Sequence, residues 1–294
     1  PMAYPLEDLK VLDLSRVLAG PFAGRMLADL GADVVKVEPP DGDLTRLWGA
    51  VIGGVPGYYH QQNVGKRNIC IDLSLPQGSE LVQALAAEAD VVLENFRPGV
   101  AARLGVSYAD LSKQNPRLVM LSISGFGQEG PEAQRAAFAP VIHAEAGLIA
   151  RQARLSGNPP YDLPVSMSDT NASLHGLIAV LSAVWMRQRT GLGQHIDMAM
   201  LDVAMILMSS HLTGYLRNGV HPKPHGNRHP YATNGAFKTK DGLVMLGASN
   251  LRQQRRLWTV LSRPDMIKRS NDERDADHEL EIKVLEEIML TRTA

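Results

Sequence analysis

The sequence predicts an α/β fold, with an open, doubly wound, mostly parallel sheet in a first domain and a second, smaller α+β domain. Two observations support this prediction. Short apolar segments alternate with segments of helical periodicity up to residue 123. Segments such as VVKV at 34–37 and VVL at 91–93 are apolar at consecutive positions, as expected of parallel strands that helices cover on both faces.

The predicted elements follow in order. Strands are expected at 9–14, 33–38, 68–73, 90–94 and 117–123, and helices at 20–30, 77–88, 98–104 and 107–113. A bridging segment reaches about residue 168. It is followed by a helix at 170–190, a strand at 195–198, a helix at 200–217, a hairpin at 235–239 and 243–247, a helix at 250–262, a polar stretch at 270–279 and a helical segment at 278–290. We therefore assign residues 1–190 to a Rossmann-like large domain that includes the linker helix, and 191–294 to the small domain.

Composition narrows the class of protein. The 294 residues are 45% hydrophobic, and 30 Lys and Arg nearly balance 31 Asp and Glu. This balance provides no overall field for nucleic acid or for an anionic membrane. The single cysteine, Cys70, excludes an internal disulfide and a cysteine-cluster metal site. We expect a soluble, cytoplasmic protein with no metal site and no membrane or nucleic-acid partner.

Asp169 is the main candidate for chemistry. It lies in Ser168-Asp169-Thr170, at the start of the long predicted helix. An aspartate at this place commonly caps the helix by accepting backbone N–H groups. A carboxylate held at the positive end of a helix is also suited to act as a nucleophile. The residue and its helix leave both roles open.

A dinucleotide-binding unit is a hypothesis that the glycines disfavour. Residues 9–38 predict strand, turn, helix and strand, and the last strand ends in Glu38, where an acid could hold a ribose. The turn, however, reads LAGPFAG at 18–24 and not G-x-G-x-x-G. Pro21 occupies the place where a pyrophosphate needs a close backbone, and Gly20-Pro21 is typical of a helix start.

Several motifs occur in order along the chain. They are VLDLSRVLAGP at 11–21, LADLGADVVKVEPP at 27–40, NVGKR at 63–67, ENFRPG at 94–99, SGFGQEGP at 124–131, SDT at 168–170, RTGLGQ at 189–194 and the DG turn at 241–242. Together they resemble the class III (family III) CoA-transferases. That family includes the formyl-CoA and carnitine CoA-transferases, of the bile-acid-inducible F type, and is related to α-methylacyl-CoA racemase. The resemblance covers nearly the whole chain.

The resemblance implies a role for Asp169. In these enzymes an aspartate at this position attacks the donor acyl-CoA thioester and forms a mixed anhydride. The CoA thiolate then forms an aspartyl-CoA thioester, which the acceptor carboxylate intercepts. No ATP is needed, and the protein must mainly exclude water. Acyl-CoA and a carboxylic acid are then the substrates, and no tightly bound cofactor is expected.

The resemblance also implies where CoA binds. Carried over by position, the CoA-contacting residues are Val17, Ala19, Ile71, Asn95, Phe96, Arg103 and Leu104. Phe96 would lie beside adenine, and Arg16, Arg97 or Arg103 would pair with phosphate. Pro39 stands where a family member has a basic residue, and Lys36 or Arg135 are candidates to replace that phosphate contact. Tyr58 matches a tyrosine of the acyl pocket.

Departures from the family pattern concern the substrate. Leu18 stands where formyl-CoA transferases have glutamine, and Ala139 where many members have an acid. The pocket should therefore be less polar, and we expect an acceptor larger or more apolar than formate or oxalate, such as a branched or unsaturated dicarboxylate. The family's glycine-rich loop is represented only by 226–230. In that loop Arg228 or His229 are candidates to bind a second carboxylate.

Two other functions are weighed against transfer. A racemase needs a His-Asp pair where this chain has Ala137-Phe138-Ala139. His143, five residues after Phe138, is interpreted as a structural histidine of a helix. A catalytically silent CoA-binding protein would keep the first-domain motifs and lose the nucleophile, which Asp169 argues against.

Assembly is the last expectation drawn from the resemblance. Family members send the chain back to complete the first domain, and two subunits interlock like links. We therefore expect a tight, interlocked homodimer. The sequence given stops at Ala294, so we expect the family's C-terminal return segment to be missing from it.

Overall fold

The computed structural model describes residues 4–152, 159–162, 165–221 and 229–294. The chain divides into two compact units, one of residues 1–148 and 162–219, the other of 149–161 and 220–294. The main division therefore falls near residue 219 and not at 190. The reason is that the strand at His195–Ala199 pairs with the sheet of the first unit instead of starting the second.

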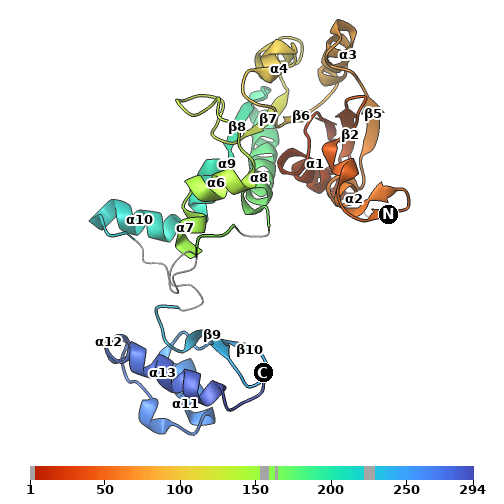
Figure 1. Cartoon of the computed structure of the whole chain (residues 1–294). Helices are drawn as coiled ribbons and strands as arrows, with labels where there is room; N and C mark the ends of the chain where they lie inside the picture. Colours follow the sequence, from red (N-terminus) through yellow and green to blue (C-terminus); the bar gives the residue numbers. More distant parts are fainter. Residues whose placement is uncertain (1–3, 153–158, 163–164, 222–228) are drawn as a thin grey trace. The chain divides into compact units, whose positions relative to one another are not determined.

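The first unit is built on a six-stranded sheet in which every pair of neighbouring strands is parallel. Its order is β5-β2-β1-β6-β7-β8 (Figure 1). The strands are β1 (Lys10–Asp13), β2 (Asp33–Glu38), β5 (Arg67–Cys70), β6 (Val91–Glu94), β7 (Val119–Ser124) and β8 (His195–Ala199). From β1 the chain moves outward to β2 and β5, then returns to β6 on the other side of β1. The carboxyl ends of β1 and β6 therefore form a topological switch point, where open α/β sheets bind ligands.

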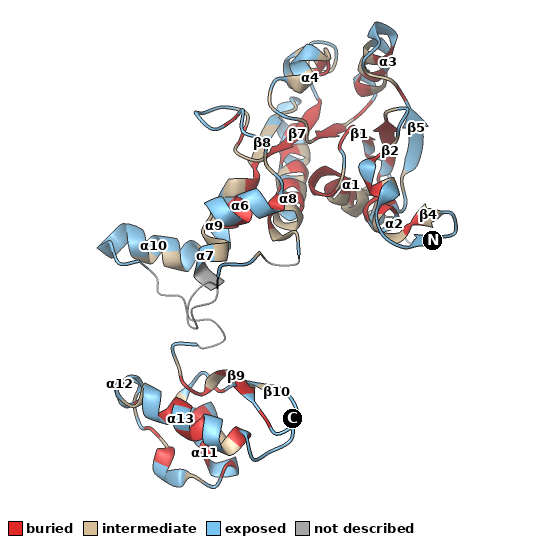
Figure 2. Cartoon of the chain, in the orientation of Figure 1, coloured by how far each residue is buried: buried red, intermediate tan, exposed pale blue. Residues whose placement is uncertain are grey.

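Helices cover both faces of this sheet, which confirms the predicted architecture. One face carries α1 (Ala19–Asp29), α8 (Met167–Thr190) and α9 (Met200–Ile206), and the other α3 (Pro76–Ala87), α4 (Val100–Arg103) and α5 (Tyr108–Leu111). Successive strand residues point to opposite faces. Val91 and Leu93 pack with the first group of helices, and Val92, between them, packs with the second. Figure 2 shows that the central strands β6 and β7 are buried, whereas the edge strand β5 is exposed.

Several elements differ from the prediction. The single helix expected at 200–217 is two helices, α9 and α10 (Ser209–Asn218). The bridging segment contains α6 (Ala139–Glu145) and α7 (Leu148–Gln152). Four short elements between β2 and β5 were not predicted: η1 (Leu44–Leu47), β3 (Val51–Ile52), β4 (Val55–Pro56) and α2 (Gly57–Asn63). They are too short to give a periodic signal.

The second unit has its own core. A hairpin of β9 (Asn234–Lys238) and β10 (Leu243–Gly247) accompanies α11 (Leu251–Val260), η2 (Pro264–Met266), α12 (Asn271–Ala276) and α13 (His278–Met289). Phe237, Trp258 and Leu285 pack together. The stretch at 270–279, predicted only as polar, contains the helix α12. Arg274 of this helix is buried, and its guanidinium donates a hydrogen bond to the Ala248 carbonyl at 3.1 Å.

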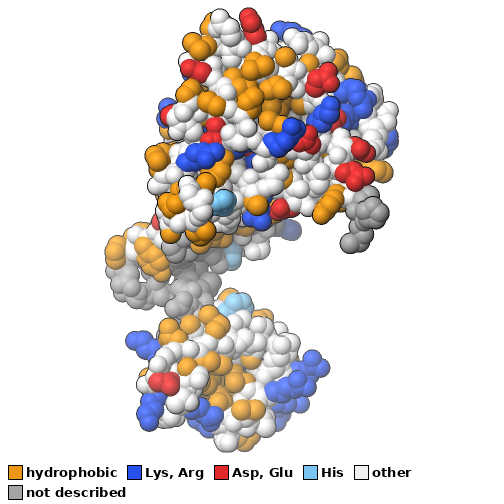
Figure 3. Space-filling model, turned by 90° about the vertical axis from the view of Figure 1, so that its right-hand side faces the viewer, with side chains coloured by type: hydrophobic (Ala, Val, Ile, Leu, Met, Phe, Trp, Pro, Cys, Tyr) orange, Lys and Arg blue, Asp and Glu red, His pale blue; other side chains and the backbone are white. Residues whose placement is uncertain are grey.

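The surface charge of the first unit is mixed on one face. On the face of the first unit shown in Figure 3, acidic and basic side chains are interspersed among apolar ones. Among the described residues, no helix combines the length and the apolar composition that crossing a bilayer requires.

Candidate active site

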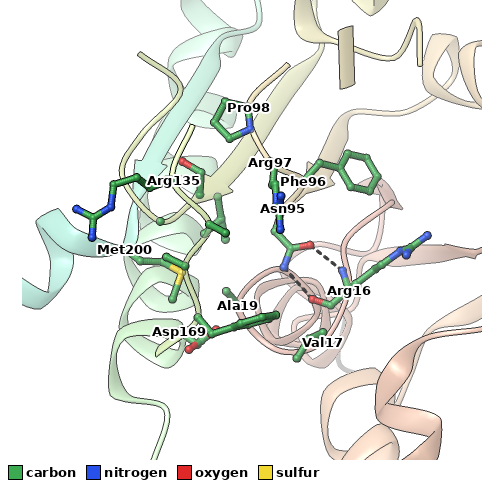
Figure 4. A pocket seen from close by; sticks show the side chains of 16 residues that line it. Arg16, Val17, Ala19, Asn95, Phe96, Arg97, Pro98, Arg135, Asp169 and Met200 are labelled. Carbon is green, nitrogen blue, oxygen red and sulfur yellow. Dashed lines mark hydrogen bonds between the residues drawn. The ribbon is translucent and has the colours of Figure 1, made fainter. Parts of the chain in front are cut away.

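The turn after β1 forms one wall of the candidate site. Val17 has a φ of 69°, which is unusual for a β-branched residue. Two contacts fix this turn: the Val17 N–H donates to Asp43 Oδ2 at 3.1 Å, and Asn95, after β6, exchanges hydrogen bonds of 2.8 Å with both the N–H and the carbonyl of Arg16. Figure 4 shows the Asn95 contacts as dashed lines. Asn95 thus holds the β1 turn to the β6 turn across the switch point.

Beneath this turn lies a buried group that we call the four-charge cluster: Asp13, Lys36, Asp43 and Lys66. Lys66 Nζ lies 2.8 Å from Asp13 Oδ2, and Lys36 Nζ lies 3.2 Å from Asp43 Oδ2. Burial alone would raise the pKa of Asp13, but the charges of Lys66 and Lys36 outweigh it and lower that pKa. Burial lowers the pKa of Lys66 to about 8, against the opposing effect of Asp13. The cluster is electrically balanced, and Asp43 ties it to Val17.

Two sequence-based hypotheses fail here. Lys36 cannot supply the phosphate contact proposed for it, because it is buried and its Nζ donates to the Ser15 carbonyl at 2.7 Å. Glu38 is not free to hold a ribose. Its carboxylate accepts from Arg46 at 2.6 and 2.9 Å and from the Tyr59 hydroxyl at 2.5 Å. Burial would raise the pKa of Glu38, but the hydrogen bonds of Arg46 and Tyr59 lower it to about 2.

A cavity opens at the switch point (Figure 4). Its walls come from the turns after β1 and β6, from the loop after β7, and from the first turns of α8 and α9. The lining residues are Arg16, Val17, Ala19, Asn95, Phe96, Arg97, Pro98, Ile123, Ser124, Gly125, Arg135, Ala136, Ala137, Phe138, Asp169 and Met200. The structure therefore brings together the predicted nucleophile and four of the seven predicted CoA-contacting residues.

Asp169 is not the cap of α8. The helix begins at Met167 with Ser166 in the capping position, so Asp169 is its third residue. The side chain is half-buried, and burial raises its pKa to about 6, although its own backbone N–H and nearby His143 act to lower it. Among the described residues, no cationic side chain forms an ion pair with it. Burial thus outweighs the backbone N–H and His143, and the pKa of this carboxylate lies above its ordinary value.

A second cavity contains two more of the predicted residues. Ile71 and Leu104 line it together with Arg16 and Phe96, which also line the first cavity. In Figure 4 the side chains of Arg16 and Phe96 extend away from Asp169. Arg103 lines neither cavity and is exposed on α4.

The other predicted residues divide between the two units. Tyr58 is half-buried, and burial followed by the charge of Asp169 raises its pKa, which places the two within electrostatic reach. Arg135 lines the first cavity, but its guanidinium is paired with Glu132 at 2.9 Å and Glu145 at 2.5 Å. His229 is exposed in the second unit, and Arg228 lies outside the described residues.

Sequence reasoning missed part of the cavity wall. Phe138 and Met200 line it, and Phe138 is 67% exposed. Glycine is required at position 125 because the segment containing Ala137 packs closely against it. A Cβ at position 125 would lie 2.6 Å from the Ala137 Cβ. The glycine loop after β7 was the available signal, because ligands of open α/β sheets lie beyond the carboxyl ends of strands.

The chain belongs to the CoA-transferase family III, whose sequence profile matches residues 6–294. It is 40% identical over 269 residues to a succinate–glutarate CoA-transferase of Agrobacterium fabrum, a match that covers 87% of this chain and 66% of that enzyme. It is 38% identical over 272 residues to the human succinyl-CoA:glutarate CoA-transferase, covering 90% of this chain and 61% of that enzyme. The chain thus spans slightly less than two thirds of the length of these two relatives.

The fold agrees with a solved structure. A crystal structure of a CAIB/BAIF family protein from Brucella suis superposes with a TM-score of 0.87 at 38% identity, covering 99% of this chain and 80% of that one. The resemblance inferred from the motifs is therefore confirmed at the level of family and fold.

Proposed function

We propose that this protein transfers CoA from an acyl-CoA thioester to a free carboxylic acid, with Asp169 as the nucleophile. The observation that carries this proposal is a half-buried carboxylate that lines the cavity at the switch point and has no cation paired with it among the described residues. With a pKa of about 6, the carboxylate is mostly ionised at neutral pH. Because no cation neutralises it, its electron pairs are available to attack.

The chemistry balances without a co-reactant. A carboxylate oxygen of Asp169 attacks the thioester carbonyl carbon, and the C–S bond breaks to give a mixed anhydride and CoA thiolate. The thiolate attacks the Asp169 carbonyl and releases the donor acid. The acceptor carboxylate then attacks this aspartyl-CoA thioester, and the thiolate finally attacks the acceptor carbonyl of the new anhydride. Asp169 is regenerated, and the new acyl-CoA leaves.

The two cavities support an extended binding mode for CoA. Arg16 and Phe96 line both of them. In our proposal the thioester lies against Val17, Ala19 and Asp169, and the adenine lies against Phe96 and the residues lining the second cavity. The phosphates then run past Arg16, whose guanidinium suits them.

The proposed acceptor is a short dicarboxylic acid. The cavity wall near Asp169 is apolar at Ala137, Phe138 and Met200, which fits a carbon chain longer than that of oxalate. The names of the two relatives above specify succinate and glutarate. Arg228 and His229 stay as predictions for the distal carboxylate.

The proposed assembly is a homodimer in the cytoplasm. An outer stripe of α8 exposes Leu174 at 41%, Ile178 at 62% and Trp185 at 67%. Apolar side chains at this spacing form one helix face, and a face of this kind is typically covered by a partner. Sedimentation at micromolar concentration tests this, and a stable monomer would refute it.

The decisive experiment uses succinyl-CoA and isotope-labelled glutarate, with chromatography of the labelled CoA ester. We expect transfer by the native protein. In Asp169→Asn the transfer rate should fall about 10³-fold or more while CoA binding is retained.

Borohydride or hydroxylamine trapping should modify Asp169, as detected by peptide mass. The rate should fall as the pH drops below about 6, where Asp169 is protonated. Exchange of the α-proton without an acceptor would indicate a racemase, and neither reaction a silent binder.

A further inference from the structure

The amino end of α8 has an unusual capping contact. The first N–H groups of a helix have no partner within the helix and are usually satisfied by the side chain of the capping residue. Ser166, in that position, provides no such side-chain hydrogen bond. Instead the Ser168 N–H donates to His143 Nε2 at 3.3 Å. The acceptor thus comes from α6, 25 residues earlier in the chain, and serves the residue immediately before Asp169.

The other ring nitrogen of His143 has an acidic partner. Nδ1 lies 2.8 Å from Asp162 Oδ1. Because Nε2 accepts a hydrogen bond, the hydrogen-bond network assigns the proton to Nδ1, where it faces the carboxylate. This arrangement is that of an imidazole fixed in one tautomer and one orientation by an acid.

The imidazole of this pair is buried, whereas its carboxylate partner is partly exposed. The His143 side chain is only 1% exposed and the Asp162 side chain 33%. His143 does not line the cavity. Asp169 does, and it directly follows Ser168, whose N–H donates to the imidazole. Apart from its charge, which acts to lower the pKa of Asp169, His143 can therefore act on the reaction through the first turn of α8.

We propose that the His143–Asp162 pair is a positioning device that fixes the first turn of α8 and thereby aims the Asp169 carboxylate at the thioester. The inference rests on the proposed function of Asp169. It assigns to His143 a role different from the merely structural one expected from the sequence. It also assigns one to Asp162, which the sequence did not single out.

The kinetic test separates positioning from binding. In His143→Ala we expect kcat for CoA transfer to fall roughly 10- to 100-fold, since small displacements of a reacting group have effects of this size. The KM for succinyl-CoA should stay within about twofold, because neither residue lines the two cavities proposed to hold CoA. His143→Gln offers an amide oxygen to Ser168 and should recover most of kcat. Asp162→Asn should lie between the native protein and His143→Ala.

A matched control is available on α8 itself. His175 Nδ1 contacts only the Asn171 carbonyl of its own helix in the hydrogen bonds of the described structure, at 2.9 Å. His175→Ala should therefore leave kcat unchanged. A kcat within twofold of native in His143→Ala, or an equal loss in His143→Ala and His175→Ala, would overturn the proposal.

A second measurement does not depend on transfer activity. Hydrogen exchange of the Ser168 amide, followed by NMR, should accelerate about tenfold or more in His143→Ala and much less in His143→Gln. If the native protein transfers no CoA but exchange behaves in this way, the proposed function fails and the capping contact stands. If transfer occurs and exchange is unaffected by His143→Ala, the positioning inference fails alone.

Discussion

Asp13 and Asp169 both flank the switch point of the first unit, but their pKa values are shifted in opposite directions. Asp13 is fully buried, and Lys66 and Lys36 overcome the effect of burial and lower its pKa. Asp169 is half-buried with no such partner among the described residues, and burial raises its pKa to about 6. The comparison teaches that burial alone does not set the charge state of an aspartate. Lys66 and Lys36 act on Asp13 beneath the turn, whereas among the described residues none of the arginines that line the cavity forms an ion pair with Asp169.

The largest effect on stability should come from breaking the four-charge cluster. Asp13→Asn leaves the buried Lys66 without its counter-charge, a change that typically costs about 3–5 kcal/mol. Urea unfolding at pH 7.5 measures it. Since the pKa of Asp13 is lowered in the folded protein, its contribution is present above the ordinary value of 3.8 and is lost as the pH falls below it. A loss under 1 kcal/mol at pH 7.5 would contradict the role we give to the cluster.

Asp169→Asn should raise the free energy of unfolding at neutral pH, whereas Asp13→Asn should lower it. A raised pKa means that the folded protein holds this proton more tightly than the unfolded chain does. The contribution of Asp169 is therefore complete below about pH 4 and is lost as the pH rises through about 6. Asparagine cannot ionise, so the variant should be more stable than the native protein by about 1–3 kcal/mol at pH 7.5. The two should have similar thermal midpoints near pH 4, and a variant less stable at both pH values would contradict the prediction.

The smallest effect should come from an exposed ion pair. Arg67 and Asp33 lie 2.5 Å apart, but their side chains are 69% and 49% exposed. Water and salt screen such pairs, so Asp33→Asn should change the free energy of unfolding by less than about 1 kcal/mol. This variant is the surface control for Asp13→Asn, and a cost as large as that of the buried variant would remove the distinction between them.

Much of the fold could be predicted from local patterns. The apolar runs identified the strands of the parallel sheet, and the ordered motifs identified the family. The domain boundary was misplaced because the pairing of β8 with β7 joins residues 120–124 to 195–199, and no local pattern reports such a pairing. The break between α9 and α10 at Leu207 and Met208 has no signal in the sequence that we can identify.

The candidate site could be predicted only in part. Asp169 was found through its motif, but its helix starts three residues earlier than expected, which removes the capping role. Lys36 was predicted to contact phosphate because the sequence does not reveal its buried partners, Asp43 and the Ser15 carbonyl. His143 was set aside because its partners, Asp162 and Ser168, are 19 and 25 residues away. Such contacts depend on tertiary packing and leave no periodic trace.

The four-charge cluster has a consequence for how solution measurements on this protein should respond to ionic strength. Its two carboxylates and two ammonium groups cancel, and their side chains are at most 1% exposed. Mobile ions, whose screening length is about 8 Å at physiological ionic strength, act mainly on charges that water can reach. Added salt should therefore leave the turn at Val17 intact while weakening any contact between exposed arginines and an anionic substrate. Ionic strength thus becomes a selective probe of how the substrate's phosphates are held.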